Sequence, residues 1–274
     1  MKNLIKKIQN NASLNGLWER DSKIVVGVSG GPDSACLLDI LAEIKEKSEM
    51  EIHIAHVNYG LRGKDSDRDE KIVEKLAEKH QLGLSVLKVE KLHKKEVTEE
   101  YLRKIRYDFF EKVRGELDYD LISVAHNSDD QVETFLLHLI RGAGIQGLSG
   151  MKYKNKNIIR PLLEVSRKEI TEYLKKNDLD YRIDKTNRTD IFFRNKVRNK
   201  LIPYIENNFN PNIKKTILDT TLNISEDMSL ISELSEKYLN WPLSIINRNN
   251  EKSNFSCNYI NRFYQIGIGS KRAC

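Results

Sequence analysis

The strongest constraint on the fold lies in residues 24–38, where an apolar run, a small polar loop and a helix-forming segment follow one another directly. The run at residues 24–28, Ile-Val-Val-Gly-Val, has the β-branched composition of a buried strand. The loop at residues 29–34 reads Ser-Gly-Gly-Pro-Asp-Ser, and Ala-Cys-Leu-Leu follows it. This order predicts a strand, a tight loop and a helix whose N-terminus can receive an anion such as phosphate.

Alternating segments extend this order through the first half of the chain. Short apolar runs predict strands at residues 24–28, 52–57, 84–89 and 121–125. Helix-forming segments lie at residues 34–47, 66–81, 98–116, 130–141 and 167–176. Strands that alternate with helices are joined by right-handed crossovers into a doubly wound, mainly parallel sheet, with ligands beyond the carboxyl ends of its strands. We therefore expect an α/β fold of this kind, followed by a small α-helical region.

Composition narrows the class of protein. The formal net charge of +6 permits a polyanionic partner such as nucleic acid but does not require one. The three cysteines, Cys36, Cys257 and Cys274, are too scattered for a disulfide framework or a CxxC pair. No apolar stretch approaches the roughly 20 residues that span a bilayer, and the N-terminus lacks the apolar core of a secretory signal. We expect a cytoplasmic protein with no membrane partner.

The loop at residues 29–34 has the composition of a phosphate site. Its serine and two glycines can present successive main-chain N–H groups to an anion. The Ser34 hydroxyl can bond phosphate, and an Asp33 carboxylate beside a polyphosphate is most simply a Mg²⁺ ligand. The order SGGxDS resembles the pyrophosphate-binding loop of ATP pyrophosphatases, which split ATP between its α and β phosphates. An ordinary capped turn with Pro32 at the helix start is the alternative.

Two further polar segments follow predicted strands. His56, Asn58 and Arg62 come at the end of the second strand, where they suit contacts to a nucleobase, ribose or phosphate. A buried histidine with a surface arginine is the structural alternative. His126, Asp130 and Glu133 follow the fourth strand and would bind a cation, either a metal or the amino groups of a substrate. Acids that compensate a helix dipole are the alternative there.

Basic residues form two more groups. Residues 192–200 hold four cations and no acid beside two phenylalanines, a pattern that fits a phosphate-backbone contact surface or a solvated helix face. Arg103 and Arg106 lie one turn apart on a predicted helix, where they either grip phosphate or cover the helix surface.

Taken in order, these segments resemble the tRNA(Ile)-lysidine synthases over roughly residues 20–235. The segments that carry the resemblance are SGGPDS, HVNYGLR, AHNSDDQVET, RGAGIQGLSG and RPLL, followed by the spaced residues Asp184, Asn187, Arg194, Arg198 and Pro203. Family members commonly have histidine where this chain has Tyr59 and often where it has Asn127. The loop alone indicates only the wider superfamily, whereas HVN-x-GLR and DDQ-x-ET are much more specific.

The resemblance implies an ATP-dependent ligase. It would adenylate the C2 carbonyl oxygen of the wobble cytidine in a tRNA(Ile) with a CAU anticodon, and the ε-amine of free L-lysine would then displace AMP. The implied catalytic residues are Asp33, His126, Asp130 and Glu133, with Mg²⁺ at Asp33 and Asp130 and a carboxylate as general base. ATP would be bound by Ser29, Gly30, Gly31, Pro32, Asp33, Ser34, His56 and Asn58. Lysine would be bound by Asp130, Glu133 and Arg194. The tRNA would be bound by Arg62, Arg103, Arg106, Arg194, Lys196, Arg198 and Lys200.

The expected organisation has three parts. Residues 1–205 would form the ATP-pyrophosphatase catalytic domain, residues 206–240 a shortened helical region that contacts tRNA, and residues 241–274 an atypical, disordered tail. A homodimer is one expected assembly. Two alternatives stay open: a tRNA-thiolating enzyme of the same superfamily, which would want a CxxC pair or a persulfide cysteine, and a catalytically impaired protein that binds nucleotide or tRNA.

Overall fold

The computed structural model describes residues 2–61, 63–89, 98–182 and 193–239. The chain divides into two compact units, residues 1–225 and 226–274. The sheet and its covering helices all lie in the first unit. Helix α10 (Ile213–Leu239) begins in that unit, and only its residues 213–225 enter the packing described below.

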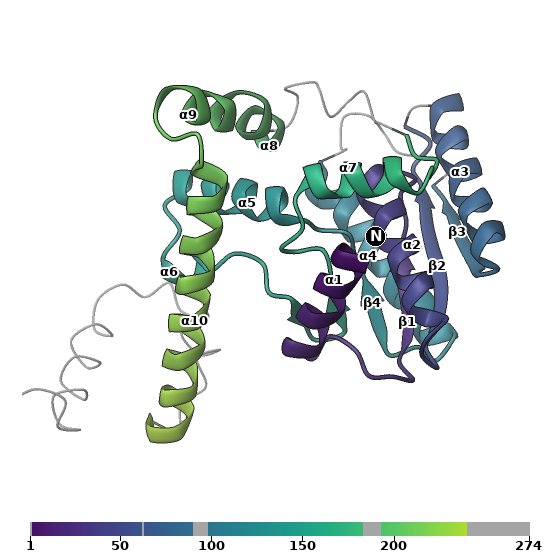
Figure 1. Ribbon diagram of the computed structural model, residues 1–274, viewed down its shortest axis with the longest axis horizontal. Coiled ribbons are helices and arrows are strands. Elements are labelled where there is room, and N and C mark those ends of the chain that lie inside the picture. The colour runs from purple at the N-terminus through teal and green to yellow at the C-terminus, as the bar shows by residue number, and fades with distance from the viewer. Residues whose placement is uncertain (1, 62, 90–97, 183–192, 240–274) are drawn as a thin grey trace, which may run out of the picture. The chain divides into compact units, whose positions relative to one another are not determined.

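A six-stranded sheet forms the centre of the first unit (Figure 1). Its order is β3-β2-β1-β4-β6-β5, and every neighbouring pair is parallel except β5 and β6. The strands are β1 (Lys23–Gly27), β2 (Glu51–Asn58), β3 (Gly83–Lys88), β4 (Leu121–Ser123), β5 (Lys154–Asn155) and β6 (Ile158–Ile159). The chain winds outward from β1 to β3 and returns to β4 on the other side of β1. Ligands of doubly wound sheets bind at such a reversal point.

Helices cover both faces of the sheet. Successive residues of a strand point to opposite sides, and apolar residues occupy both sides here, so each face needs a covering layer. Ile24 and Val26 of β1 pack in one apolar cluster with α1, α2, α3 and α7, whereas Val25 packs in another with Phe110 of α4. Gly27 of β1 leaves the space that the Phe110 ring occupies. The helices are α1 (Lys2–Leu14), α2 (Pro32–Lys45), α3 (Lys64–His80), α4 (Glu99–Glu116) and α7 (Arg167–Lys176).

A third apolar cluster joins the remaining helices. Val132 and Leu136 of α5 pack with Val197, Ile202 and Ile217. From residue 193 the chain passes through α8 and a short π-helix into α9. The wider turn of the π-helix comes just before Pro203, which cannot donate a main-chain hydrogen bond. These elements are α5 (Ser128–Ile140), α6 (Ile145–Leu148), α8 (Phe193–Lys196), the π-helix η2 (Val197–Leu201) and α9 (Ile202–Asn208).

The structure confirms the expected fold class, all four expected strands and all five expected helices to within a few residues at their ends. Sequence reasoning missed α1 and the β5–β6 pair, whose strands of two residues each are too short to show a periodicity. Within the described residues, no helix has both the length and the apolar character to cross a membrane. The boundary expected after residue 205 stays a prediction, and residues 241–274 lie outside the described part.

Candidate active site

The glycine-rich loop after β1 is wound around its own hydroxyl groups. The Ser29 N–H donates to Ser34 Oγ (3.1 Å), and the Gly31 N–H donates to Ser29 Oγ (3.4 Å). The two hydroxyl oxygens lie 3.1 Å apart, and Ser34 Oγ also donates to the Gly31 carbonyl. Two main-chain donors therefore face the inside of the loop, where they meet polar oxygen atoms.

Gly30 is the residue on which this conformation depends. Its φ is +80°, and a Cβ atom there would stand 3.1 Å from the main-chain oxygen of Asp69. The backbone conformation therefore favours glycine, and a side chain would also be tight against α3. Pro32 and Asp33 open helix α2, whose unpaired N–H groups and dipole favour an anion at this end.

A cavity of about 180 Å³ opens beside the loop, at the carboxyl ends of β1 and β4. It lies where the strand order reverses. Lining it are Ser29, Asp33 and Ser34 from the loop and α2, Arg106 and Tyr107 from α4, and His126 after β4. Tyr59, from the segment after β2, lines the cavity as well, so the structure brings residues from four of the sequence-predicted segments together.

His126 is held in its neutral form. Burial lowers its pKa well below the ordinary value, and the charges of Arg160, Arg103 and Arg106 lower it further. Arg160 Nε lies 3.3 Å from His126 Nδ1 and donates to it. The imidazole proton is therefore on Nε2, which leaves His126 a neutral hydrogen-bond donor on the cavity wall.

Asp33 is the carboxylate of the phosphate loop itself. Burial raises its pKa to about 6, and the negative charge of Asp130 adds to the shift, although Arg167 and Arg198 oppose it. A divalent cation would stabilise the charged forms of Asp33 and Asp130, so this donor pair fits Mg²⁺. Within the described residues, no group of three or more His, Cys, Asp or Glu side chains is arranged around a metal position. The remaining ligands of such a cation would be phosphate oxygens and water.

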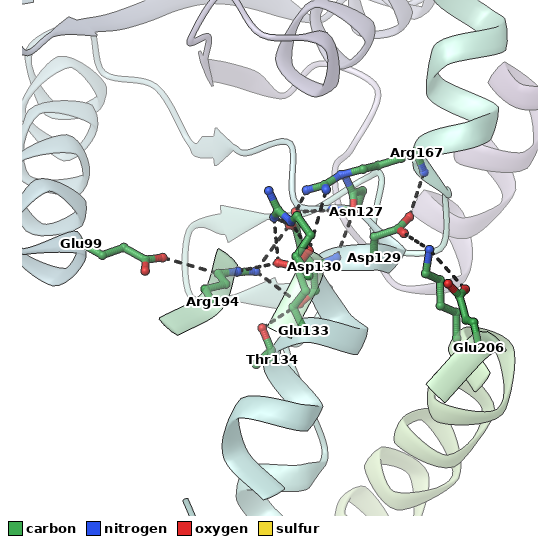
Figure 2. A network of polar contacts seen from close by, with 11 residues as sticks. Glu99, Asn127, Asp129, Asp130, Glu133, Thr134, Arg167, Arg194 and Glu206 are labelled. Atoms are coloured by element: carbon green, nitrogen blue, oxygen red, sulfur yellow. Dashed lines mark hydrogen bonds and ion pairs between the residues drawn. The ribbon is translucent and has the colours of Figure 1, made fainter. Parts of the chain in front are cut away.

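Glu133 forms the centre of a buried ion network with three arginines, of which Arg194 and Arg198 lie closest and Arg167 lies 3.8 Å away (Figure 2). It is only 1% exposed. Arg194 Nε lies 2.7 Å from Oε2, and Arg198 contacts Oε1 through Nε (2.5 Å) and Oε2 through a terminal nitrogen (2.8 Å). Burial alone would raise the pKa of Glu133, but the hydrogen bonds and charges of these arginines outweigh it and lower the pKa. Both carboxylate oxygens are therefore occupied by guanidinium groups.

Asp130 takes part in the same network from the first turn of α5. Its carboxylate accepts the main-chain N–H of Asn127 (3.1 Å), and the Asn127 side chain accepts the N–H of Asp130, which makes a capping box. Its other oxygen lies 3.3–3.4 Å from Arg167, Arg194 and Arg198. Figure 2 shows Arg167 of α7 and Arg194 of α8 both reaching this carboxylate. Burial raises the pKa of Asp130 despite them.

His56 and Asn58, predicted to bind ATP, support the loop and the neighbouring helix in this structure. His56 is buried, and its Nδ1–H donates to the Val28 carbonyl (2.8 Å) just before the loop. Asn58 donates to Glu70 of α3 (2.7 Å) and accepts the Gly60 N–H (3.0 Å). These contacts hold the end of β2 against β1 and α3, and the ATP contacts of both residues stay predictions.

The described residues predicted to bind tRNA fall in three places. Arg106 lines the cavity, and Arg103 lies over the Tyr107 ring at 4.7 Å. Lys196 and Lys200 instead line a groove on α8, η2 and α9 together with the exposed aromatic residues Phe193 and Tyr204. Arg194 and Arg198 belong to the Glu133 network, and Arg62 lies outside the described residues.

Sequence reasoning assigned no role to two arginines that the structure places at the site. Arg160 follows β6 and contacts His126, and Arg167 opens α7 and contacts Asp130. The signal for Arg167 was available, because Ser166 and Glu169 form a capping box that fixes the helix start beside it. Arg160 lay in the RPLL segment but had no local pattern that pointed to His126.

The buried histidines predict a loss of stability in mild acid. His126 and His56 both have pKa values lowered by burial. The unfolded chain therefore binds protons below about pH 6.5 that the folded chain does not, and stability falls as pH falls through this window. In urea titrations at a series of pH values, the variant His126→Asn is expected to lose less stability between pH 6.5 and 5, by up to about 1.4 kcal/mol per pH unit. An unchanged slope would mean that His126 is protonated in the folded state.

Comparison with known proteins identifies the family to which the chain belongs. The sequence profile of the PP-loop domain matches residues 1–205. The chain belongs to the PP-loop family.

Individual curated proteins show a more specific similarity than the family profile does. The tRNA(Ile)-lysidine synthase of Clostridium tetani is 44% identical over 239 residues, which make up 85% of this chain and 51% of that protein. The synthase of Clostridioides difficile is 37% identical over 238 residues, or 85% of this chain and 52% of that protein. The chain spans about half the length of the curated relatives it matches. Among solved structures, a U34-tRNA thiolase from Methanococcus maripaludis matches with a TM-score of 0.67 at 19% identity, over 82% of this chain and 79% of that one. That likeness concerns the fold alone.

Proposed function

We propose that this protein ligates lysine to a tRNA(Ile) at the expense of ATP. In this reaction the C2 carbonyl oxygen of the wobble cytidine attacks the α phosphorus and pyrophosphate leaves. The ε-amine of lysine then attacks C2, loses a proton and displaces AMP. The observation that carries the proposal is the meeting of the phosphate loop, neutral His126 and the acid–arginine network at the switch point of a PP-loop fold. The name shared by the curated relatives supports the choice of substrates.

The loop side of the site suits the pyrophosphate half of ATP. The start of α2 presents the positive end of its dipole there. The N–H groups of Ser29 and Gly31 and the Ser34 hydroxyl bond to oxygen atoms of the loop itself in this structure, and they would exchange these partners for phosphate oxygens. Mg²⁺, held through Asp33 and Asp130, would neutralise phosphate charge as pyrophosphate leaves. Arg106 on the cavity wall adds a permanent cation. Charge that develops on the leaving group is thus stabilised by groups already in place.

The cavity wall that carries His126 suits the α phosphate of ATP and the cytosine base of the tRNA. His126 can donate from Nε2 to an oxygen without carrying charge of its own, and Arg160 fixes its orientation. A bound phosphate would raise the pKa of this imidazole, because an anion favours the charged form. His126 therefore strengthens its interaction with the phosphate as negative charge accumulates.

The acid–arginine network suits the second substrate. Lysine carries an ammonium group and a carboxylate, which need an acid and an arginine. Asp130, Glu133 and Arg194 supply both kinds of group within one cluster. Since both Glu133 oxygens are already bound, an arriving ammonium must exchange with one of the guanidinium groups. The displaced arginine then becomes available to the lysine carboxylate or to phosphate.

Thiolation is the less favoured candidate. The thiolase of similar fold has an iron–sulfur cluster, whereas the only free cysteine among the described residues here is Cys36. Cys36 is buried, and burial raises the pKa of its thiol far above the ordinary value. A thiol in that state is a poor nucleophile and a poor metal ligand.

A labelling assay tests the proposal. The protein is incubated with ATP, radiolabelled lysine and an isoleucine tRNA transcript with a CAU anticodon, and label in the RNA is expected. A transcript whose wobble cytidine is replaced by uridine is the matched control and should stay unlabelled. Absence of label in the cytidine transcript, with ATP binding retained, would exclude ligation and leave a nucleotide-binding protein.

A further inference from the structure

The phosphate loop is held from outside by a residue that no motif includes. The main-chain N–H of Arg182 donates to the Gly30 carbonyl (3.0 Å). On its other side Gly30 lies against the main chain of Asp69 in α3. Residue 182 is 152 positions after Gly30, so this contact is made only in the folded chain.

The Arg182 side chain fastens the same segment to α3. One terminal nitrogen donates to Asp65 Oδ1 (2.9 Å), and the other donates to the Asp65 carbonyl (2.8 Å) and lies 3.2 Å from Asp69 Oδ1. The loop, the first turns of α3 and residue 182 therefore form one closed set of contacts. The side chain of Arg182 binds α3, while its main-chain N–H holds the loop.

The held carbonyl fixes the direction of the next donor. In a trans peptide the C=O and the following N–H point in opposite directions. With the Gly30 carbonyl directed at Arg182, the Gly31 N–H is directed into the loop, toward Ser29 Oγ. His56 does the same for the Val28–Ser29 peptide, because it holds the Val28 carbonyl while the Ser29 N–H faces Ser34 Oγ.

We propose that Arg182 is a positioning residue for the phosphate site. Its main-chain N–H holds the Gly30 carbonyl while its side chain is bound to Asp65 and Asp69 of α3, and this set of contacts, here called the latch, sets the direction of the Gly31 N–H. It rests on the proposed function only in that the loop binds the phosphates of ATP. Without the latch the Gly30–Gly31 peptide is free to rotate, and a donor must be reoriented each time an anion binds. The latch therefore acts on affinity for pyrophosphate and ATP and leaves lysine affinity unchanged.

Arg68 provides a matched control for the latch. It pairs with the same Asp65 oxygen (3.2 Å) from an exposed position on α3, and among the described residues it makes no polar contact with the loop. Removing Arg68 therefore perturbs the Asp65 ion pair without touching the held carbonyl. Asp65→Asn weakens the latch without changing residue 182.

The experiment measures binding of inorganic pyrophosphate and of ATP to the full chain by calorimetry. For Arg182→Ala we expect both dissociation constants to rise about tenfold, or about 1.4 kcal/mol. Arg182→Lys should recover part of this loss, Asp65→Asn should show a smaller loss, and Arg68→Ala should bind as the parent does. In ligation assays Arg182→Ala should raise KM for ATP while KM for lysine stays constant.

The possible results distinguish a failure of the latch hypothesis from a failure of the proposed function. Pyrophosphate binding that depends on Arg182 in a protein that does not ligate lysine would support the latch and remove the proposed function. Unchanged dissociation constants in folded Arg182→Ala and Asp65→Asn, with ligation intact, would overturn the latch and leave the function. A lower melting temperature with unchanged affinity would likewise overturn it, since the contact would then serve stability alone.

Discussion

Glu133→Gln is expected to lower the free energy of unfolding by about 3 kcal/mol, the largest loss of stability from a single conservative change in this site. Glu133 is 1% exposed and is the common partner of Arg194 and Arg198. Removing its charge leaves Asp130 as the one carboxylate that still pairs with both guanidinium groups among the described residues, whereas the amide preserves volume. The estimate takes the lower end of the range for broken buried pairs because both arginines keep about a fifth of their side chains exposed. Urea unfolding of the purified variant measures the loss.

Two further variants identify the cause. Adding Arg198→Gln to Glu133→Gln should cost less than the sum of the two single changes, because the second change removes one of the stranded charges. Asp108→Asn breaks an exposed pair with Lys104 four residues away and should change stability by less than about 0.5 kcal/mol. Additive losses in the double variant would show that the network is held by packing and not by charge.

The sequence predicted well whatever depends on neighbouring residues. Short apolar runs fixed the strands, and the Ser-Gly-Gly-Pro-Asp-Ser order placed a turn and a helix start where the structure has them. The acids after β4 were expected to bind a cation, which stays a prediction, whereas the alternative role at the helix start is seen for Asp130, which forms a capping box with Asn127 at the start of α5. In each case the deciding forces are local: strand burial, glycine conformation and helix capping.

What the sequence could not predict depends on contacts across long stretches of chain. Glu133 meets Arg194 and Arg198 across 61 and 65 residues, and Arg160 meets His126 across 34. No periodicity encodes such pairings, so the expected lysine seat did not anticipate that both Glu133 oxygens would be bound. The contacts by which His56 and Asn58 support the loop and α3 were missed for the same reason, because they arise from the packing of β2 against β1 and α3.

Asp33→Asn is expected to abolish ligation while making the protein more stable. The carboxylate is the group expected to hold Mg²⁺ beside the phosphates, and the amide cannot replace its charge. We expect the rate of tRNA labelling to fall at least about 10³-fold. Stability should change in the other direction, because burial raises the pKa of Asp33 from 3.8 to about 6. A carboxylate with a raised pKa is unfavourable when ionised, so near neutral pH the wild type folds against a cost of up to about 3 kcal/mol.

The pH dependence of that gain is the decisive measurement. The raised pKa already includes the opposing attraction of Arg167 and Arg198, so replacing the carboxylate by asparagine is expected to stabilise the protein by up to about 3 kcal/mol near pH 7.5. As pH falls through 6 the wild-type carboxylate takes up a proton in the folded state, and the difference between the two proteins should shrink and vanish near pH 4. An inactive variant with raised stability cannot owe its inactivity to unfolding. A variant that is destabilised at neutral pH, or that keeps its labelling rate, would show that Asp33 is a structural cap of α2 and that the phosphates are bound without it.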